Sequence, residues 1–147
     1  LDVQALPLPV ARTAIRANNA QGGINVRVDP DHPRSTIVEL FDKGGIYLTT
    51  NAERKIETIF FREDYGRTDM DEVGEIEYTS RTIEQYTQQY FSRIKERDVQ
   101  RRRFKVVVDY AYGRISTVLP EILGRLGCDV IALNAYSDYG RAPKTPT

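Results

Sequence analysis

Two apolar runs late in the chain, residues 104–110 and 128–134, place the strongest constraint on its fold. Each has the length and the β-branched composition of a buried strand. Between them apolar residues recur at helical spacing, and Gly127 closes the pattern. The stripe consists of Ile115, Val118, Leu119, Ile122, Leu123 and Leu126. Strand, helix and strand at this spacing predict a parallel βαβ unit with a right-handed crossover.

The first half of the chain predicts shorter elements. Residues 1–6 predict a short strand, and the prolines of residues 7–9 open a helix that ends near residues 18–19. Residues 24–28 alternate as a strand, followed by strands at residues 36–41 and 46–49 in a hairpin or meander. The apolar residues of the first of these strands, all on one face, are Ile24, Val26 and Val28.

Three further segments complete the predicted architecture. Thr50 and Glu53 form a capping box for a helix with Ile56, Ile59 and Phe60 on one side. Residues 62–80 form a connector, and a helix over residues 80–97 follows, with a core stripe of Ile83, Tyr86, Tyr90, Phe91 and Ile94. The expected fold class is α/β, with a mixed sheet in the N-terminal half and a parallel βαβ unit in the C-terminal half.

Composition narrows the class of protein. The 147 residues carry 21 basic and 21 acidic side chains, so no net field favours nucleic acid or a membrane surface as partner. The basic run 93–103 predicts a solvated helix end and linker. Cys128 is alone, which excludes a disulfide framework. No membrane span or signal peptide is seen, so we expect a cytoplasmic protein, and the start at Leu1 suggests a piece of a longer polypeptide.

The loop between the first two hairpin strands holds Asp29, Asp31 and the single histidine, His32. Three readings stay open. The carboxylates accept backbone N–H groups in an Asx-type turn; or the loop contacts a phosphate or a divalent cation, with Asp29 as ligand; or its groups act in acid–base catalysis. A second candidate is the segment from Asp109 to Arg114, which follows a buried strand at a position where α/β folds bind ligands. It is either a turn that supports a cleft between domains or a plain helix start that uses Gly113.

The hairpin segment, residues 22–49, resembles the active-site segment of the α-D-phosphohexomutases, the superfamily of phosphoglucomutase and phosphomannomutase. That family reads Gly-Gly-Ile, a strand, Thr-Ala-Ser-His-Asn-Pro, and then a Phe-rich strand. The spacing from its serine to that Phe matches Asp29 to Phe41 without a gap. Residues 1–16 resemble the strand and helix before the serine loop, and residues 104–134 resemble the opening of the second family domain.

This resemblance implies mixed α/β domains, a hexose phosphate partner, and phosphoryl transfer between sugar carbons through a phosphoserine and Mg²⁺. Residues 1–72 would be part of domain I and residues 73–147 part of domain II, with further domains downstream. Partial domains leave sheet edges unpaired, and such edges recruit other strands. We therefore expect a homo-oligomer.

The residues expected to perform the chemistry depart from the family pattern. Asp29 stands at the serine position, His32 at that of the first proline and Glu39 at that of a lysine. A phosphoserine mechanism needs a hydroxyl, whereas Asp29 offers only a labile acyl phosphate. Glu39 reverses a charge where a dianion would bind.

These departures predict a phosphohexomutase-like domain of sugar-phosphate metabolism that is catalytically inactive in this chain. The alternative hypothesis is a non-catalytic regulatory or assembly module attached to a sugar-phosphate nucleotidylyltransferase of the mannose-1-phosphate guanylyltransferase type.

Overall fold

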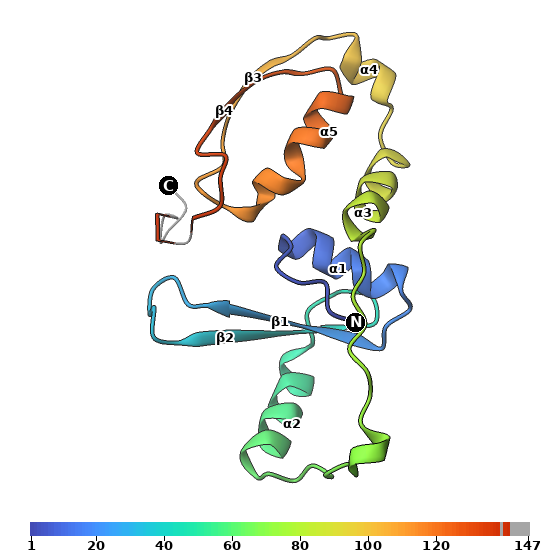
Figure 1. Cartoon of the computed structure of the whole chain (residues 1–147), viewed down its shortest axis with the longest axis vertical. Coiled ribbons are helices and arrows are strands. Elements are labelled where there is room, and N and C mark those ends of the chain that lie inside the picture. The colour runs from blue at the N-terminus through green and yellow to red at the C-terminus, as the bar shows by residue number, and fades with distance from the viewer. Residues whose placement is uncertain (139, 142–147) are drawn as a thin grey trace.

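Two separate two-stranded sheets, one in each half of the chain, organise the structure (Figure 1). The computed structural model describes residues 1–138, 140 and 141. Its elements are α1 (Leu8–Ala17), β1 (Gly22–Val28), β2 (Thr36–Asp42), α2 (Thr50–Phe61), η1 (Met70–Glu72), α3 (Thr82–Phe91), α4 (Glu96–Gln100), β3 (Lys105–Asp109), η2 (Arg114–Thr117), α5 (Leu119–Arg125) and β4 (Asp129–Leu133). No helix in this described part is both long and apolar enough to cross a bilayer.

The C-terminal half forms the predicted βαβ unit. β3 and β4 pair in parallel, with Val107 opposite Ile131, and α5 lies between them in sequence. The single expected helix is divided at Val118 into the 3₁₀ turn η2 and the helix α5. Pro120 in the first turn of α5 accounts for the division, because it has no N–H to continue a preceding helix.

The N-terminal half contains the predicted hairpin, in which β1 and β2 pair antiparallel from Gly22↔Asp42 to Val28↔Thr36. In Figure 1 this hairpin crosses the middle of the molecule, with α1 on one side and α2 on the other. Alternation places Ile24, Val26 and Val28 on one face, as expected, but that face is open and Val26 is 63% exposed. Together with the parallel pair, the hairpin confirms the α/β class.

Two expected strands are wrong in extent. Residues 1–6 make only an isolated bridge, Asp2 to Tyr78, and residues 46–49 only the bridge of Tyr47 to Phe41. The second is short because Thr49 already caps α2, its hydroxyl accepting from the N–H of Ala52 at 3.4 Å. The N-cap is therefore Thr49 and not Thr50, and the expected capping box of Thr50 and Glu53 is wrong, because Ala52 occupies the third helical position.

The helix expected over residues 80–97 is also wrong in extent. α3 ends at Phe91, a turn follows, and α4 begins at Glu96. The Ser92 hydroxyl donates to the Gln89 carbonyl at 2.8 Å, a local bond that competes with continued helix. The break lets both Ile94 and Val99 pack against the main core.

The main core joins the two halves of the chain. Its buried members are Val10 of α1, Phe91 of α3, and Val118, Ile122 and Leu126 from the βαβ unit. The expected division after residue 72 stays a prediction, and its second part extends to residues 142–147, which lie outside the described residues. This core contains residues from both sides of that division.

Arg125 fastens α5 to the helices before β3. Its Nε and Nη2 donate to the two carboxylate oxygens of Glu96 at 2.9 and 2.8 Å. Its guanidinium lies 4.0 Å from the centre of the Phe91 ring, and its carbonyl accepts from Gln100 Nε2 at 2.9 Å. A bidentate pair of this kind has a fixed geometry, so it orients α4 relative to α5.

We expect Val10→Ala to lower the free energy of unfolding by roughly 2 kcal/mol, since each buried methylene contributes about 0.8 kcal/mol and a cavity is left behind. Val10 is fully buried at 0% exposure. Val26→Ala, at a 63% exposed site, is the matched control and should cost well under half as much. Urea unfolding followed by circular dichroism and tyrosine fluorescence measures both, and equal losses would contradict the shared core.

Candidate functional site

The loop between β1 and β2 is an Asx-type turn built on Asp29. One carboxylate oxygen of Asp29 accepts from the N–H of Asp31 at 2.9 Å, and the other lies 3.3 Å from Nδ1 of His32. The N–H of Asp29 donates to the Ser35 carbonyl at 3.0 Å, and the N–H of Ser35 donates to the His32 carbonyl at 2.7 Å. The N–H of Asp31 and the proximity of His32 lower the pKa of Asp29 despite some burial, so its carboxylate stays charged.

A metal ion finds few ligands in this loop. Nowhere in residues 1–138 and 140–141 do three or more His, Cys, Asp or Glu side chains come together to hold one. The Asp29 carboxylate is already engaged by a backbone N–H and an imidazole, while 75% of the His32 side chain is exposed. Mg²⁺ usually binds through carboxylates in near-octahedral geometry. The loop by itself does not fit that requirement, and metal binding at Asp29 stays a prediction.

Glu39 lies on β2, directly opposite Asn25 of β1. Its carboxylate accepts hydrogen bonds from Asn25 Nδ2 at 2.6 Å, Arg27 Nη2 at 3.2 Å and the Tyr47 hydroxyl at 3.3 Å. Burial raises the pKa of Glu39, since only 11% of its side chain is exposed. The hydrogen bonds from Asn25 and Arg27 and the charge of Arg27 outweigh that effect, and the net pKa is lowered. Glu39 is therefore a fully satisfied, charged carboxylate.

The strand register separates the two acidic positions of interest. Asp29 lies just beyond the end of β1 and four residues after Asn25, a distance of roughly 13 Å at about 3.3 Å per residue. Asn25 and Arg27 project from the same face of the hairpin, because side chains alternate along a strand. The structure thus brings Asp29 and His32 together and places Glu39 apart from them, with Arg27 between.

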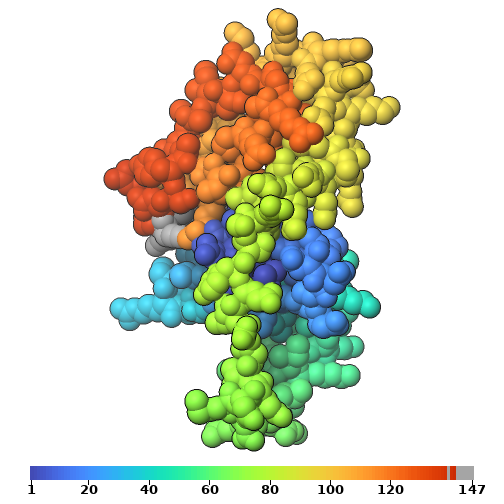
Figure 2. All heavy atoms as spheres, turned by 45° about the vertical axis from the view of Figure 1, so that its right-hand side comes forward, coloured from blue at the N-terminus to red at the C-terminus, as the bar shows by residue number. Residues whose placement is uncertain are grey.

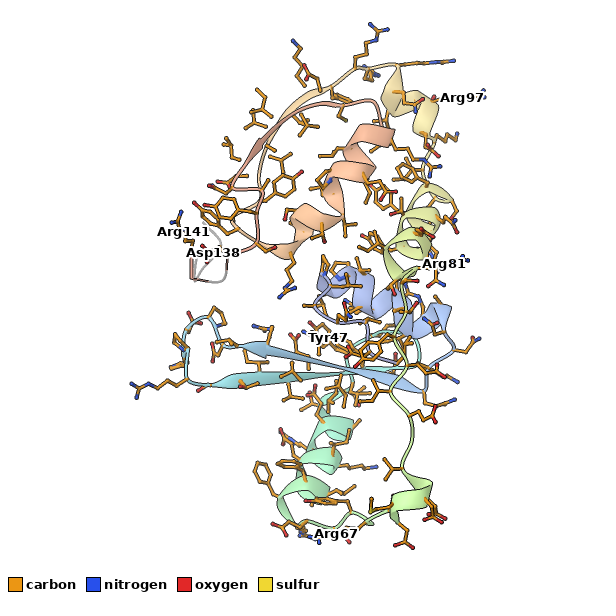
Figure 3. All side chains as sticks on the ribbon, in the orientation of Figure 1. Tyr47, Arg67, Arg81, Arg97, Asp138 and Arg141 are labelled. Atoms are coloured by element: carbon orange, nitrogen blue, oxygen red, sulfur yellow. The ribbon has the colours of Figure 1, made fainter. Side chains whose placement is uncertain are left out.

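α1 completes the surroundings of Glu39. The Arg12 Nε donates to the Gly45 carbonyl, and its guanidinium lies 5.4 Å from the ring centre of Tyr47 and 5.7 Å from that of Phe41. Figure 3 labels Tyr47 in this region, between the hairpin and α1. Gly45 is required here, because it has φ +68° and a Cβ would lie 2.4 Å from the Arg12 carbonyl oxygen.

The partners of Glu39 were not predicted from the sequence. Period-two alternation places Asn25 and Arg27 on one face of β1, which is the signal that could have suggested them. Tyr47 and Arg12 lie in other elements and carry no such signal, since only the turn at Gly45 and the packing of α1 bring them close.

The second candidate turn fastens the ends of β3 and β4. Asp109 Oδ1 accepts from the N–H of Ala111 at 2.8 Å and from Asn134 Nδ2 at 3.0 Å. These bonds, chiefly that from Asn134, lower the pKa of Asp109. Gly113 is the N-cap residue of η2, as a plain helix start requires. The hydrogen bonds of Asp109 to Ala111 and Asn134 are structural, and a ligand role for this turn stays a prediction.

Comparison with known proteins shows which family this chain resembles. Residues 1–67 match the family described as phosphoglucomutase/phosphomannomutase, alpha/beta/alpha domain I. The chain is 32% identical over 138 residues to a phosphoglucomutase/phosphomannomutase of Thermococcus kodakarensis, covering 94% of this chain and 30% of that protein. It is 30% identical over 145 residues to a phosphoglucosamine mutase of Methanocaldococcus jannaschii, covering 97% and 31%. The chain belongs to the α-D-phosphohexomutase superfamily.

The matches cover nearly the whole of this chain but only a part of each phosphohexomutase relative. The matches include nearly all of this chain but only about 30% of each relative's length. A probable phosphoglucosamine mutase of Methanosphaera stadtmanae repeats the pattern, at 31% identity over 144 residues, with 95% of this chain and 31% of the relative covered. The activity of a whole phosphohexomutase is therefore not a property that this chain can be assigned from likeness alone.

The lowered pKa of Glu39 predicts a pH dependence of stability. A carboxylate whose pKa is lower in the folded than in the unfolded chain stabilises the fold above its ordinary pKa, here 4.5, and this contribution is lost as the pH falls through the folded value. We expect Glu39→Gln to show a smaller loss of stability between neutral and acidic pH than the wild type.

Urea unfolding at a series of pH values measures this difference. Glu57→Gln, at an exposed carboxylate on α2, is the control and should follow the wild-type curve. If the Glu39→Gln curve also runs parallel to the wild type, the hydrogen bonds to Glu39 contribute nothing in solution.

Proposed function

We propose that this chain is a phosphohexomutase-like module of sugar-phosphate metabolism that does not itself transfer phosphoryl groups. The observation that carries the proposal is the carboxylate of Asp29, which stands at the position of the family serine and is used as the anchor of a turn. A phosphorylated serine is an ester that can hold and return the group. An aspartate bound to a backbone N–H preserves the loop geometry without that chemistry.

The surroundings of Glu39 support the same proposal. At the position of a family lysine, Glu39 is negative, and it pairs with Arg27, the cation of β1 nearest the loop. Neutralising Arg27 removes the positive charge that an incoming phosphate dianion would need. Hexose phosphate and Mg²⁺ remain the ligand and metal expected of the family, and in this proposal they would depend on protein parts beyond the hairpin.

The wider setting of the module is also proposed. Residues 1–72 and 73–147 would be parts of domains I and II in a cytoplasmic protein that forms homo-oligomers. The alternative hypothesis, a regulatory or assembly module attached to a mannose-1-phosphate guanylyltransferase type enzyme, draws on the same observation. A loop that keeps its turn but loses its nucleophile suits binding or assembly better than turnover.

We expect the chain to show no interconversion of glucose or mannose 1-phosphate and 6-phosphate when supplied with Mg²⁺ and a hexose bisphosphate activator. The reason is the missing hydroxyl at Asp29. The Asp29→Ala variant should therefore show the same rate as the wild type, namely that of the reaction mixture without protein. A coupled assay for the 6-phosphate measures this. Turnover by the wild-type chain above a blank without protein would overturn the proposal.

We expect Asp29→Ser alone to bind no hexose phosphate, because Glu39 still opposes the anion and occupies Arg27. Asp29→Ser with Glu39→Lys should gain weak binding, since it frees Arg27 and adds a second cation. Isothermal titration calorimetry with glucose 6-phosphate compares the two, with Asp29→Ser plus Glu57→Lys as the charge-matched control. Tight binding by the wild type that survives replacement of Asp29 and Glu39 would place the ligand site elsewhere.

A further inference from the structure

The charges of this neutral chain are sorted toward two ends of the molecule. One end, which we name the basic end, carries six exposed cations: Arg93, Lys95, Arg97, Arg101, Arg102 and Arg103. They lie in the turn before α4, in α4 and in the turn after it. Two acidic residues lie within this stretch: Glu96, which is bound by Arg125 from α5, and the exposed Asp98. The basic end therefore carries a net positive charge that its own neighbours leave largely uncompensated.

The opposite charge gathers in the connector between α2 and α3. This acidic end carries six exposed carboxylates: Glu63, Asp64, Asp69, Asp71, Glu72 and Glu75. Arg67 is the single basic residue within residues 63–75. The sequence interpretation of the basic run as a solvated helix end and linker, and of residues 62–80 as a connector, does not explain why the charges are sorted by sign.

The two ends lie far apart in one molecule. Figures 1 and 2 show α4 at one extreme of the long axis and η1 at the other. Figure 3 makes the same point with single side chains, since Arg97 is labelled at the upper extreme and Arg67 at the lower. A molecule of this shape cannot bring its own two ends together, whereas a second copy can reach both.

We propose that the basic end of one copy docks on the acidic end of a second copy, with the two molecules side by side and antiparallel. A twofold axis then pairs both ends at once, so that two equivalent contacts form and the assembly closes. The zero net charge leaves no long-range repulsion between copies. An extended polyanion such as nucleic acid fits less well, because the acidic end would repel it.

This inference specifies the surface for the homo-oligomer named under the proposed function, and it rests on that part of the proposal. It does not depend on the loss of catalysis. Strand pairing at open sheet edges would give an oligomer that resists salt, whereas contacts between exposed charges are individually weak and are screened by salt. Ionic strength therefore separates the two kinds of oligomer.

The first measurement is the weight-average mass of the 147-residue chain by light scattering or sedimentation. We expect a dimer at about 0.01 M salt, where the screening length is about 30 Å, and a monomer at about 1 M, where it is about 3 Å. A monomer at both would overturn this inference and the proposed oligomer together. A dimer at both would overturn only this inference.

Charge reversal tests the surface itself. Arg101→Glu, Arg102→Glu and Arg103→Glu in one chain, or Asp69→Lys, Asp71→Lys and Glu72→Lys in another, should each abolish self-association. Mixing these two triple variants should restore a heterodimer at low salt. One chain with all six changes has a net charge of zero, but its two ends keep only weak charges of exchanged sign, so it should dimerise more weakly than the wild type.

A matched control distinguishes the effect of the charges at the two ends from the effect of the net charge of the chain. The acidic-end triple combined with Arg34→Glu, Lys43→Glu and Lys55→Glu also has zero net charge but has two basic ends, and it should stay a monomer. These last three residues are exposed and lie outside the basic end. Circular dichroism checks that each variant is folded. Dimerisation of this control, or failure of the two triple variants to form a heterodimer at low salt, would overturn the inference.

Discussion

Packing of α1 against α3 and the βαβ unit is the constraint on which the rest of the structure depends. Val10 is fully buried in the same cluster as Phe91 and Val118, so residues from both ends of the chain meet at α1. The opposite face of α1 contacts the hairpin, with Ile15 beside Gly23. One helix therefore holds both sheets in place, and with them the loop that carries Asp29.

The hairpin holds two carboxylates, Asp29 and Glu39, in different local surroundings. At its tip, Asp29 uses its carboxylate to close an Asx turn, a task that needs no catalytic partner. Further along, Glu39 is surrounded by donors from β1 and from the turn at Gly45. Both carboxylates are thus satisfied by local contacts. This arrangement suits the proposed module, in which the loop keeps its turn and does not transfer phosphoryl groups.

Open apolar faces accompany the sorted charges. Val26 and Val38 are a cross-strand pair on the uncovered side of the hairpin, and they are 63% and 57% exposed. Val107 and Ile131 are the corresponding pair on the parallel sheet, at 66% and 61%. Sheets with one uncovered apolar face are normally completed by further packing. The relatives, of which this chain matches about 30%, contain additional sequence, and assembly with another surface fits these faces.

The sequence alone determined the elements whose signals are local and periodic. The βαβ unit, the hairpin and α1 were predicted because apolar spacing of two or about 3.6 residues specifies strand or helix directly. The family was suggested by the resemblance of residues 22–49 to the phosphohexomutase active-site segment, and the same resemblance aligned Asp29 with the family serine. Even the face shared by Asn25 and Arg27 is implicit in that alternation.

Only the tertiary structure decided the rest. The break after Phe91, the cap at Thr49 and the loss of the strand over residues 46–49 depend on side-chain bonds and packing that compete with local propensity. Two further features depend on how segments of the chain are placed relative to one another. They are the hydrogen bond from Tyr47 to Glu39 and the separation of the basic and acidic ends. Distance between residues remote in sequence is set by the packed core, and periodicity carries no information about it.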